Sequence, residues 1–387
     1  MMIALLLLVA LVAAACSQES LRGNVPADIQ FKDAHELSLG GLTFLSEARE
    51  SPYDRLPLAA KEVVAAGVWN QSIESAGVHV DFETDATEIY ISYELIGSSL
   101  EFTNMDAMGC SGVDLYAWDP ASKGFRFVAA WAKVTAAQDQ GLLANFLEFP
   151  ANKTLYRIHL PLYNRVKSFK VGVSKSAAVF GKVATPPAFS SIVWYGTSIA
   201  QGKASALPSS SYISQLNLAL YGQKTQVLNF GFSSNGHMDI EVAQFLTTIT
   251  PTPRAFVIDC LPNMNAQDVA EKTAPLVRYI RAAPGLSATP ILLVESATYA
   301  NEWFNATART GQQKKREALR AAYDELVSVE HVQGLHFVAG GDDMLPGTLA
   351  SSPFPAFAVQ VDGTHPTDLG MRLMFEFWMQ RINQLSV

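Results

Sequence analysis

The spacing of apolar residues along the chain changes near its middle. From about residue 66 to 175, apolar positions alternate with polar ones or form short runs rich in Val, Ile, Tyr and Phe. Gly, Asp, Asn and Pro bound these runs, which predict strands over 78–84, 88–96, 113–118, 125–131, 154–163 and 166–174. Because most of these strands follow one another without a helical segment, they favour an antiparallel β-sandwich. Residues 139–149 fit either a helix or a strand.

The second half has the pattern of an α/β protein. Apolar strands at 191–195, 226–230, 254–259, 290–294 and 334–338 alternate with helical patterns at 210–221, 238–249, 268–283, 313–329 and 366–382. This alternation predicts a parallel sheet with helices on both faces and a site at the carboxyl ends of its strands. The chain is therefore expected to divide into a β-sandwich domain (25–175), a Pro-containing linker (176–190) and an α/β domain (191–387).

Composition narrows the classes of function. The chain has 387 residues, of which 49% are hydrophobic and 17% charged, as is typical of a globular protein with two domains. The net charge is −8, and no run of Lys and Arg is longer than three residues. Nucleic acids and anionic membrane surfaces are therefore not the expected partners.

The first residues have the pattern of an export signal. An apolar run ends in the small residues Ala13, Ala14 and Ala15, which predicts a secretory signal peptide over residues 1–15. The run is too short to indicate a membrane span, although a buried helix is an alternative. Cys16 follows directly, so association with a membrane depends on whether this cysteine is lipidated. The expected location is secreted or extracytoplasmic, and the sequence does not indicate an oligomeric state.

The remaining cysteines and the missing motifs argue against cofactors. Two cysteines, Cys110 and Cys260, do not make a disulfide framework; Cys260 reads as a buried thiol, and a bridge between the two is the alternative. Neither His-Glu-x-x-His nor Cys-x-x-Cys occurs, and both glycine-rich nucleotide motifs are missing. We expect no metal and no cofactor.

Three residues have the spacing of a serine hydrolase. Ser198 lies in the turn after the first strand of the α/β domain, within IVWYGTSIAQG (192–202), and is the candidate nucleophile, although a serine there can also cap a helix. His365 comes three residues after Asp362 in DGTHP (362–366). A tight turn lets the carboxylate orient the ring and leaves the other ring nitrogen for Ser198. The alternative is a capping aspartate beside a surface histidine.

Two further segments can stabilise the negative oxygen that forms during acyl transfer. Asn263, in DCLPNMN (259–265), follows a strand and can donate through its amide, although Pro-Asn is also a common turn pair. Ser234 lies in LNFGFSSNGHMD (228–239), where a loop opens into a helix and backbone N–H groups can hold an anion.

At these four segments the chain resembles the SGNH (GDSL-like) hydrolase superfamily. It is most similar to the branch with an N-terminal β-sandwich that carries a Gly-x-Asp-Leu-Tyr motif, here residues 112–116. The resemblance implies a three-layer α/β/α hydrolase domain after the antiparallel β-sandwich. It also implies a catalytic triad of Ser198, Asp362 and His365. The implied oxyanion donors are the backbone N–H of Ser198, the backbone N–H of Ser234 and the side chain of Asn263.

Two departures from the family pattern bear on the site. Position 234 is usually glycine in relatives, and a backbone φ above zero would be costly for the serine found here. A long insert at 340–360 precedes Asp362 and is expected to form a pocket wall. Relatives often remove acetyl or other small acyl groups from carbohydrate, so the resemblance implies a secreted serine esterase acting on a glycan ester. The alternatives are a lipid or short-chain esterase, an O-acyltransferase and a non-catalytic glycan-binding protein.

Overall fold

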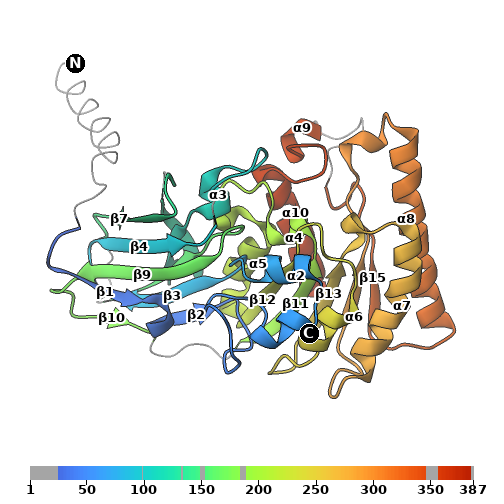
Figure 1. The fold of residues 1–387 in the computed structure, drawn as a ribbon, viewed down its shortest axis with the longest axis horizontal. Helices are drawn as coiled ribbons and strands as arrows, with labels where there is room; N and C mark the ends of the chain where they lie inside the picture. Colours follow the sequence, from blue (N-terminus) through green and yellow to red (C-terminus); the bar gives the residue numbers. More distant parts are fainter. Residues whose placement is uncertain are drawn as a thin grey trace.

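The computed structural model describes residues 25–97, 99–131, 134–148, 153–183, 189–345 and 356–384. The predicted signal peptide and Cys16 lie outside this part of the chain. Two regions lie side by side along the long axis of the molecule, one built from antiparallel strands and the other from a helix-covered parallel sheet (Figure 1). No helix in the described ranges combines the length and apolar character needed to cross a membrane.

The antiparallel region is a β-sandwich. One sheet has the strand order β1-β9-β4-β7, and the other has β10-β3-β8-β5-β6 with β2 paired to β3. Their bounds are β1 (Ile29–Asp33), β2 (Ser38–Gly40), β3 (His79–Thr84), β4 (Ile89–Leu95), β5 (Asp114–Asp119), β6 (Gly124–Ala130), β7 (Gln138–Ala144), β8 (Thr154–His159), β9 (Val166–Ser174) and β10 (Phe180–Gly181). Short helices α2 (Ala66–Ser72) and α3 (Ala107–Ser111) interrupt the strands.

The strands predicted from alternation are all present, and their apolar faces meet between the sheets. Phe82 and Ile158 from one sheet pack in the same buried cluster as Ile91 and Val171 from the other. The ambiguous segment 139–149 lies mostly in strand β7, because its backbone pairs with β4, for example between Tyr90 and Leu142. The β-sandwich prediction is therefore confirmed.

The second region is a five-stranded parallel sheet with the order β12-β11-β13-β14-β15. Its strands are β11 (Ser190–Gly196), β12 (Thr225–Gly231), β13 (Ala255–Asp259), β14 (Ile291–Val294) and β15 (Leu335–Val338). Its helices are α4 (Ser198–Gln201), α5 (Tyr212–Leu220), α6 (Ile240–Leu246), α7 (Ala266–Ala282), α8 (Ala306–Ser328), α9 (Ala356–Val359) and α10 (Asp368–Gln384).

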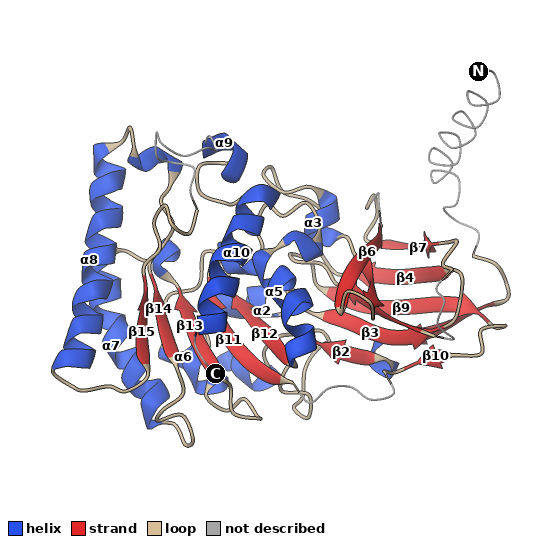
Figure 2. Cartoon of the chain, turned by 180° about the vertical axis from the view of Figure 1, so that it is seen from behind, coloured by secondary structure: helices blue, strands red, loops and turns tan. Residues whose placement is uncertain are grey.

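Helices cover both faces of the parallel sheet. Residues of α6, α7 and α8 pack in one buried cluster with Val193, Phe230 and Ile258. Residues of α5 and α10 pack in a second buried cluster with Trp194 and Val257. These two residues adjoin Val193 and Ile258 in sequence, and side chains of adjacent strand residues point to opposite faces of the sheet. Figure 2 shows α5 and α10 in front of the sheet and α7 and α8 beside β15. The predicted three-layer α/β/α architecture is confirmed.

A segment from the N-terminal part of the chain completes the core of the parallel region. Leu56, Val64, Val68 and Trp69 are buried in the same cluster as the helices α6, α7 and α8. The guanidinium of Arg55, fully buried, donates to the carbonyl oxygens of residues 229 and 231 at 2.8 and 2.9 Å, where β12 ends. Residues that precede the sandwich strand β3 therefore belong to the packing of the α/β layers.

The Gly-x-Asp-Leu-Tyr motif joins the two regions. Asp114 is fully buried at the start of β5, where one carboxylate oxygen accepts from the backbone N–H of Ser209 at 2.8 Å. Its other oxygen lies 2.8 Å from Nδ1 of His159. The hydroxyl of Tyr116 donates to the Ser209 hydroxyl at 3.1 Å. Two residues of the motif thus bind Ser209, in the 3₁₀ helix Pro208–Ser210 that leads into α5, by hydrogen bonds.

Candidate active site

Ser198 lies where the first strand of the parallel sheet turns into a helix. It is the first residue of α4, immediately after Thr197 and the end of β11, and only 8% of its surface is exposed. The helix is short because Gly202 adopts φ +106° and ends it in the left-handed region. The Ser198 hydroxyl lies 2.9 Å from Nε2 of His365. The chain segments that carry these two side chains are 167 residues apart in sequence.

The loop before α10 brings a carboxylate to the same imidazole. Oδ2 of Asp362 lies 2.7 Å from Nδ1 of His365, and Oδ1 accepts from the backbone N–H of His365 at 2.8 Å and of Thr364 at 3.1 Å. Gly363, with φ +82°, allows this tight turn. Partial burial raises the pKa of Asp362, but hydrogen bonds from the backbone and ring of His365 outweigh it and lower the pKa to about 2.

A loop after β12 lies against the turn that holds Ser198. The backbone N–H of Phe232 donates to the carbonyl of Gly196 at 3.0 Å, and that of Ser233 donates to the side chain of Gln201 at 2.9 Å. Ser234 follows with φ +60°, the left-handed conformation that glycine adopts at no cost. The serine at this position therefore carries the backbone strain expected from the sequence.

Asn263 ends a 3₁₀ helix that follows β13 and faces the same loop. With its amide oxygen turned toward the loop, it accepts from the backbone N–H of Gly236 at 3.0 Å and of Asn235 at 3.1 Å. Gly236 is essential to the contact, because a Cβ there would lie 2.1 Å from the carbonyl oxygen of Gly196.

Two residues of the sandwich region reach the site, and the sequence pattern did not single them out. Nδ2 of Asn104 donates to Oδ2 of Asp362 at 2.8 Å, and the hydroxyl of Tyr163 donates to the backbone carbonyl of Ser198 at 3.2 Å. Burial raises the pKa of Tyr163 well above its usual value, so this hydroxyl remains a donor. Asn104 lies in a turn outside every predicted strand. Tyr163 ends the strand predicted over 154–163, but the observed strand β8 stops at His159, so the pattern did not indicate a site residue.

A lysine lies between these two contacts. Nζ of Lys203 is 3.2 Å from the centre of the Phe102 ring and 4.7 Å from that of Tyr163. Burial lowers the pKa of Lys203 to about 8. Its position falls in the stretch 203–210 that follows the nucleophile segment. The ring of Phe102 thus packs the turn that carries Asn104 against the α/β region.

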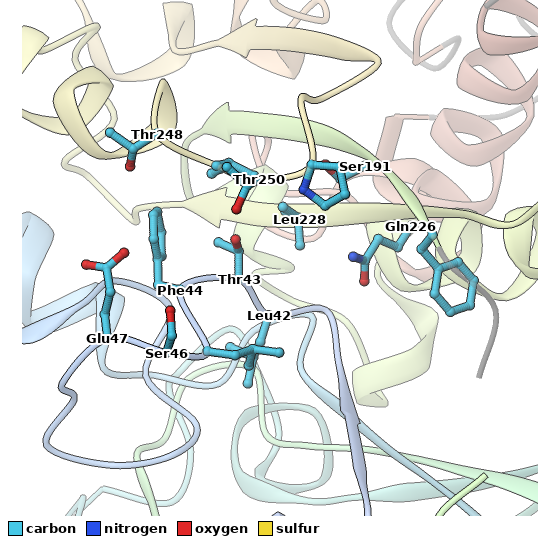
Figure 3. A pocket seen from close by; sticks show the side chains of 14 residues that line it. Leu42, Thr43, Phe44, Ser46, Glu47, Ser191, Gln226, Leu228, Thr248 and Thr250 are labelled. Atoms are coloured by element: carbon cyan, nitrogen blue, oxygen red, sulfur yellow. The ribbon is translucent and has the colours of Figure 1, made fainter. Parts of the chain in front are cut away.

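A pocket lies at the amino ends of the parallel strands, on the opposite side of the sheet from Ser198. This pocket of about 370 Å³ is lined by residues that include Phe44, Ser191, Gln226 and Thr250. Ser191 and Gln226 are each the second residue of their strands, whereas Ser198 follows the carboxyl end of β11. Figure 3 shows these side chains converging from the N-terminal segment and the strand starts. This pocket therefore does not open on Ser198.

The cysteines are not part of the site. Cys110 and Cys260 are both buried and both free, so the alternative of a disulfide between them is wrong. Cys260 lies in the core beneath the parallel sheet, as expected for a buried thiol. Within the described residues, no cluster of three or more His, Cys, Asp or Glu side chains could hold a metal ion.

Comparison with known proteins gives two family matches that together span most of the chain. Residues 190–383 match the GDSL-like Lipase/Acylhydrolase family. Residues 29–179 match the family described as the N-terminus of Esterase_SGNH_hydro-type. A search of curated protein sequences returns no significant match.

Solved structures share the arrangement of both regions. A Bacteroides ovatus protein assigned as a GDSL-like lipase is 25% identical, with a TM-score of 0.81 over 92% of this chain and 98% of its own. The salicylyl-acyltransferase of a tetracycline biosynthetic pathway is 18% identical, with a TM-score of 0.65 over 94% and 96%. A family two carbohydrate esterase from Cellvibrio japonicus is 14% identical, with a TM-score of 0.53 over 92% and 98%.

Proposed function

The chain belongs to the GDSL-like lipase/acylhydrolase family and is an SGNH-type esterase, and we propose that it removes acetyl or other small acyl groups from carbohydrate. One observation carries the proposal of a serine mechanism. The Ser198 hydroxyl lies 2.9 Å from one nitrogen of His365, whose other nitrogen lies 2.7 Å from the Asp362 carboxylate. A serine hydroxyl becomes a useful nucleophile when a base so oriented can take its proton.

In the proposed reaction, Oγ of Ser198 attacks the ester carbonyl carbon while Nε2 of His365 accepts the proton of the Ser198 hydroxyl. Collapse of the tetrahedral intermediate breaks the bond to the sugar oxygen, and His365 returns the proton to that oxygen. The acyl group stays on Ser198 until a water, deprotonated by His365, attacks the acyl carbon. The bond from that carbon to Oγ of Ser198 then breaks, His365 returns the proton to Oγ, and the acid is released. Asp362, ionised above a pKa of about 2, stabilises the imidazolium in both steps.

Three donors are proposed for the oxyanion. They are the backbone N–H groups of Ser198 and Ser234 and the Nδ2 of Asn263. The contact between Asn263 and residues 235–236 supports this role, because two hydrogen bonds to the amide oxygen orient the side chain. A donor that is already oriented stabilises the transition state without the cost of reorganisation.

The acyl and sugar parts of the substrate rest on likeness rather than on geometry. The carbohydrate esterase named above shares the fold of both regions with this chain. The apolar leader over residues 1–15 supports export, where polysaccharide esters are accessible. Sequencing the N-terminus of the mature protein would test export, since a protein that retains residue 1 has not been processed.

A covalent probe and aryl esters test the proposed function together. A fluorophosphonate should attach to Ser198, as located by peptide mapping, and the Ser198→Ala variant should remain unlabelled. His365→Ala should lower kcat on 4-nitrophenyl acetate by roughly 10³–10⁴-fold. His331→Ala, which changes an exposed histidine far from the site, is the matched control and should keep full activity.

Two results would contradict the proposal. An adduct on a different serine of the folded protein would remove Ser198 from its role. Faster cleavage of 4-nitrophenyl decanoate than of the acetate would favour an esterase for long acyl chains over a deacetylase.

A further inference from the structure

A pocket of about 380 Å³ opens on the carboxyl side of the parallel sheet, beyond β14. The described residues that line it are Thr298, Glu302, Trp303, Arg309, Gln313, Arg316 and Asp342. Trp303 is the one large apolar side chain among them, and the others carry hydroxyl, amide, carboxylate or guanidinium groups. A pocket with one aromatic wall and several polar groups suits a polar ligand rather than an acyl chain.

Hydrogen bonds connect this pocket to the loop that carries Asp362 and His365. The backbone N–H of Ala300 donates to the carbonyl of Gly363 at 3.0 Å and to the side chain of Gln360, also at 3.0 Å. Nε2 of Gln360 in turn donates to the carbonyl of Thr298 at 2.7 Å. The segment 298–300, which forms part of the pocket wall, is therefore bonded directly to the loop that carries the proposed base His365. We expect a polymer whose ester lies at Ser198 to extend as far as this pocket.

The aromatic wall is exposed and yet held in place. Trp303 is 72% exposed and the adjacent Phe304 is 66% exposed, with their rings edge to face at 5.6 Å. Nη1 of Arg309 donates to the backbone carbonyl of Glu302 at 2.7 Å and to that of Trp303 at 3.3 Å. Arg309 thus holds the backbone beneath the two rings, and an exposed aromatic pair beside a pocket is suited to contact a ligand.

The polar wall is balanced in charge. Arg316 forms a two-pronged ion pair with Glu302, at 2.9 and 3.1 Å, and the pocket contains one further arginine and one further aspartate. The carboxylate of Glu302 also accepts from the backbone N–H of Tyr299 at 2.8 Å. Since two cations face two anions, the wall has no excess charge to attract a phosphate or a carboxylate.

We propose that this pocket binds a neutral sugar ring of the polysaccharide that carries the ester, with Trp303 stacking on the ring. The face of an indole is electron-rich, and the C–H groups on one face of a pyranose carry partial positive charge. The hydroxyl groups of the same ring would exchange hydrogen bonds with the polar wall, including the side chain of Gln313. This inference rests on the proposed function, because it names the part of the substrate that the esterase holds.

The test compares a polymer with a small ester on the same variants. Wild type, Trp303→Ala and Trp303→Phe are assayed on acetylated xylan, by released acetate, and on 4-nitrophenyl acetate. Trp303→Ala should lower the ratio of kcat/KM on xylan to kcat/KM on the aryl ester by on the order of tenfold, with the phenylalanine variant between it and wild type. Phe146→Ala, which removes an aromatic ring that is 85% exposed on the sandwich, is the matched control and should keep the ratio.

Binding without turnover separates failure of this inference from failure of the proposed function. In isothermal titration calorimetry, the Ser198→Ala variant should release or absorb heat when xylohexaose is titrated in. The double variant Ser198→Ala/Trp303→Ala should give no such heat. An unchanged xylan ratio in Trp303→Ala, or binding that does not depend on Trp303, would overturn the inference while aryl acetate turnover still stands. If the wild-type protein did not hydrolyse 4-nitrophenyl acetate, the proposed function itself would be overturned.

Discussion

The side chain of Asn104 connects the β-sandwich to the aspartate of the proposed triad. The donor Nδ2 of Asn104 reaches Oδ2 of Asp362, the same oxygen that faces Nδ1 of His365. A hydrogen bond to a carboxylate is worth more than one between neutral groups, and it restricts the carboxylate to one rotation. We therefore expect Asn104 to act as a positioning residue through Asp362, without touching the substrate.

Replacement of Asn104 tests this role. Asn104→Ala should lower kcat on 4-nitrophenyl acetate by roughly 10–100-fold with little change in KM, because a bond to a charged group contributes about 1.5–3 kcal/mol. Asn104→Asp should be more harmful, because it replaces the donor by a second negative charge next to Asp362. Steady-state kinetics on the purified variants would measure both effects.

The exposed neighbour Thr103 provides the control, since Thr103→Ala alters the same turn without removing the donor. Equal losses in Thr103→Ala and Asn104→Ala would show that the turn, rather than the amide, matters. A rise in KM with unchanged kcat would place Asn104 in substrate binding and contradict the positioning role.

Sequence reasoning singled out some residues of the candidate site and missed others. Ser198, Asp362 and His365 lie in short segments at strand or helix ends, and the structure places the His365 ring within hydrogen-bonding distance of both other side chains. Asn104 acts across 258 residues of sequence, and its role depends on how the sandwich docks. Neither local periodicity nor turn chemistry carries that information. The positive φ of Ser234 was anticipated only because relatives have glycine there.

At the scale of elements, strand β5 and the 3₁₀ helix Pro208–Ser210 are joined by buried polar groups rather than by an apolar seam. The Asp114 carboxylate satisfies a backbone N–H at the helix and a ring nitrogen of the neighbouring strand β8 at once. A buried polar group with one partner removed costs the desolvation of the group left behind. The structure therefore gives the Gly-x-Asp-Leu-Tyr motif a role in docking the two regions. The sequence alone did not indicate this role.

Removal of the carboxylate should destabilise the protein strongly. Asp114→Ala leaves the Ser209 N–H and the His159 ring without their acceptor, and we expect a loss of about 2–4 kcal/mol in the free energy of unfolding. Tyr116→Phe removes only the bond to the Ser209 hydroxyl, so its cost should be near 1 kcal/mol. Equilibrium denaturation in urea would measure both.

Asp119→Ala, at the solvent-facing end of the same strand, is the comparison. Its carboxylate pairs with the exposed Arg126 and accepts from the Ala121 N–H and the Ser122 hydroxyl in the adjacent turn, where solvent weakens such contacts. If Asp114→Ala cost no more than Asp119→Ala, the motif would have no role in docking.

At the scale of the whole molecule, a segment from the N-terminal half of the chain packs in the core of the parallel region. The strand pattern correctly predicted a sandwich followed by a parallel sheet. It gave no sign that the segment around Leu56, Val68 and Trp69 packs beneath the parallel sheet. Apolar periodicity indicates that a face is buried, but it does not identify the surface that buries it.

A chain cut at the linker should therefore fail to fold. A fragment starting at residue 189 lacks Leu56, Val68 and Trp69, each worth about 1.5–3 kcal/mol of burial, against a total stability of about 5–15 kcal/mol for a typical domain. We expect this fragment to be insoluble or unfolded, as measured by soluble yield and circular dichroism. Full-length protein from the same expression system is the control. A soluble fragment that a fluorophosphonate labels at Ser198 would contradict the expectation.

The bonds of Arg55 impose an order on the synthesis of the chain. Its guanidinium binds carbonyl oxygens that follow it by 174 and 176 residues. At roughly 5–20 residues per second, a ribosome needs roughly 9–35 s to make that stretch. During this interval the segment from Arg55 to Trp69 has left the ribosome while the sheet that buries it does not yet exist. The segment from Arg55 to Trp69 therefore has no sheet to cover it until β12 emerges, and we expect the nascent chain to need protection from aggregation during that interval.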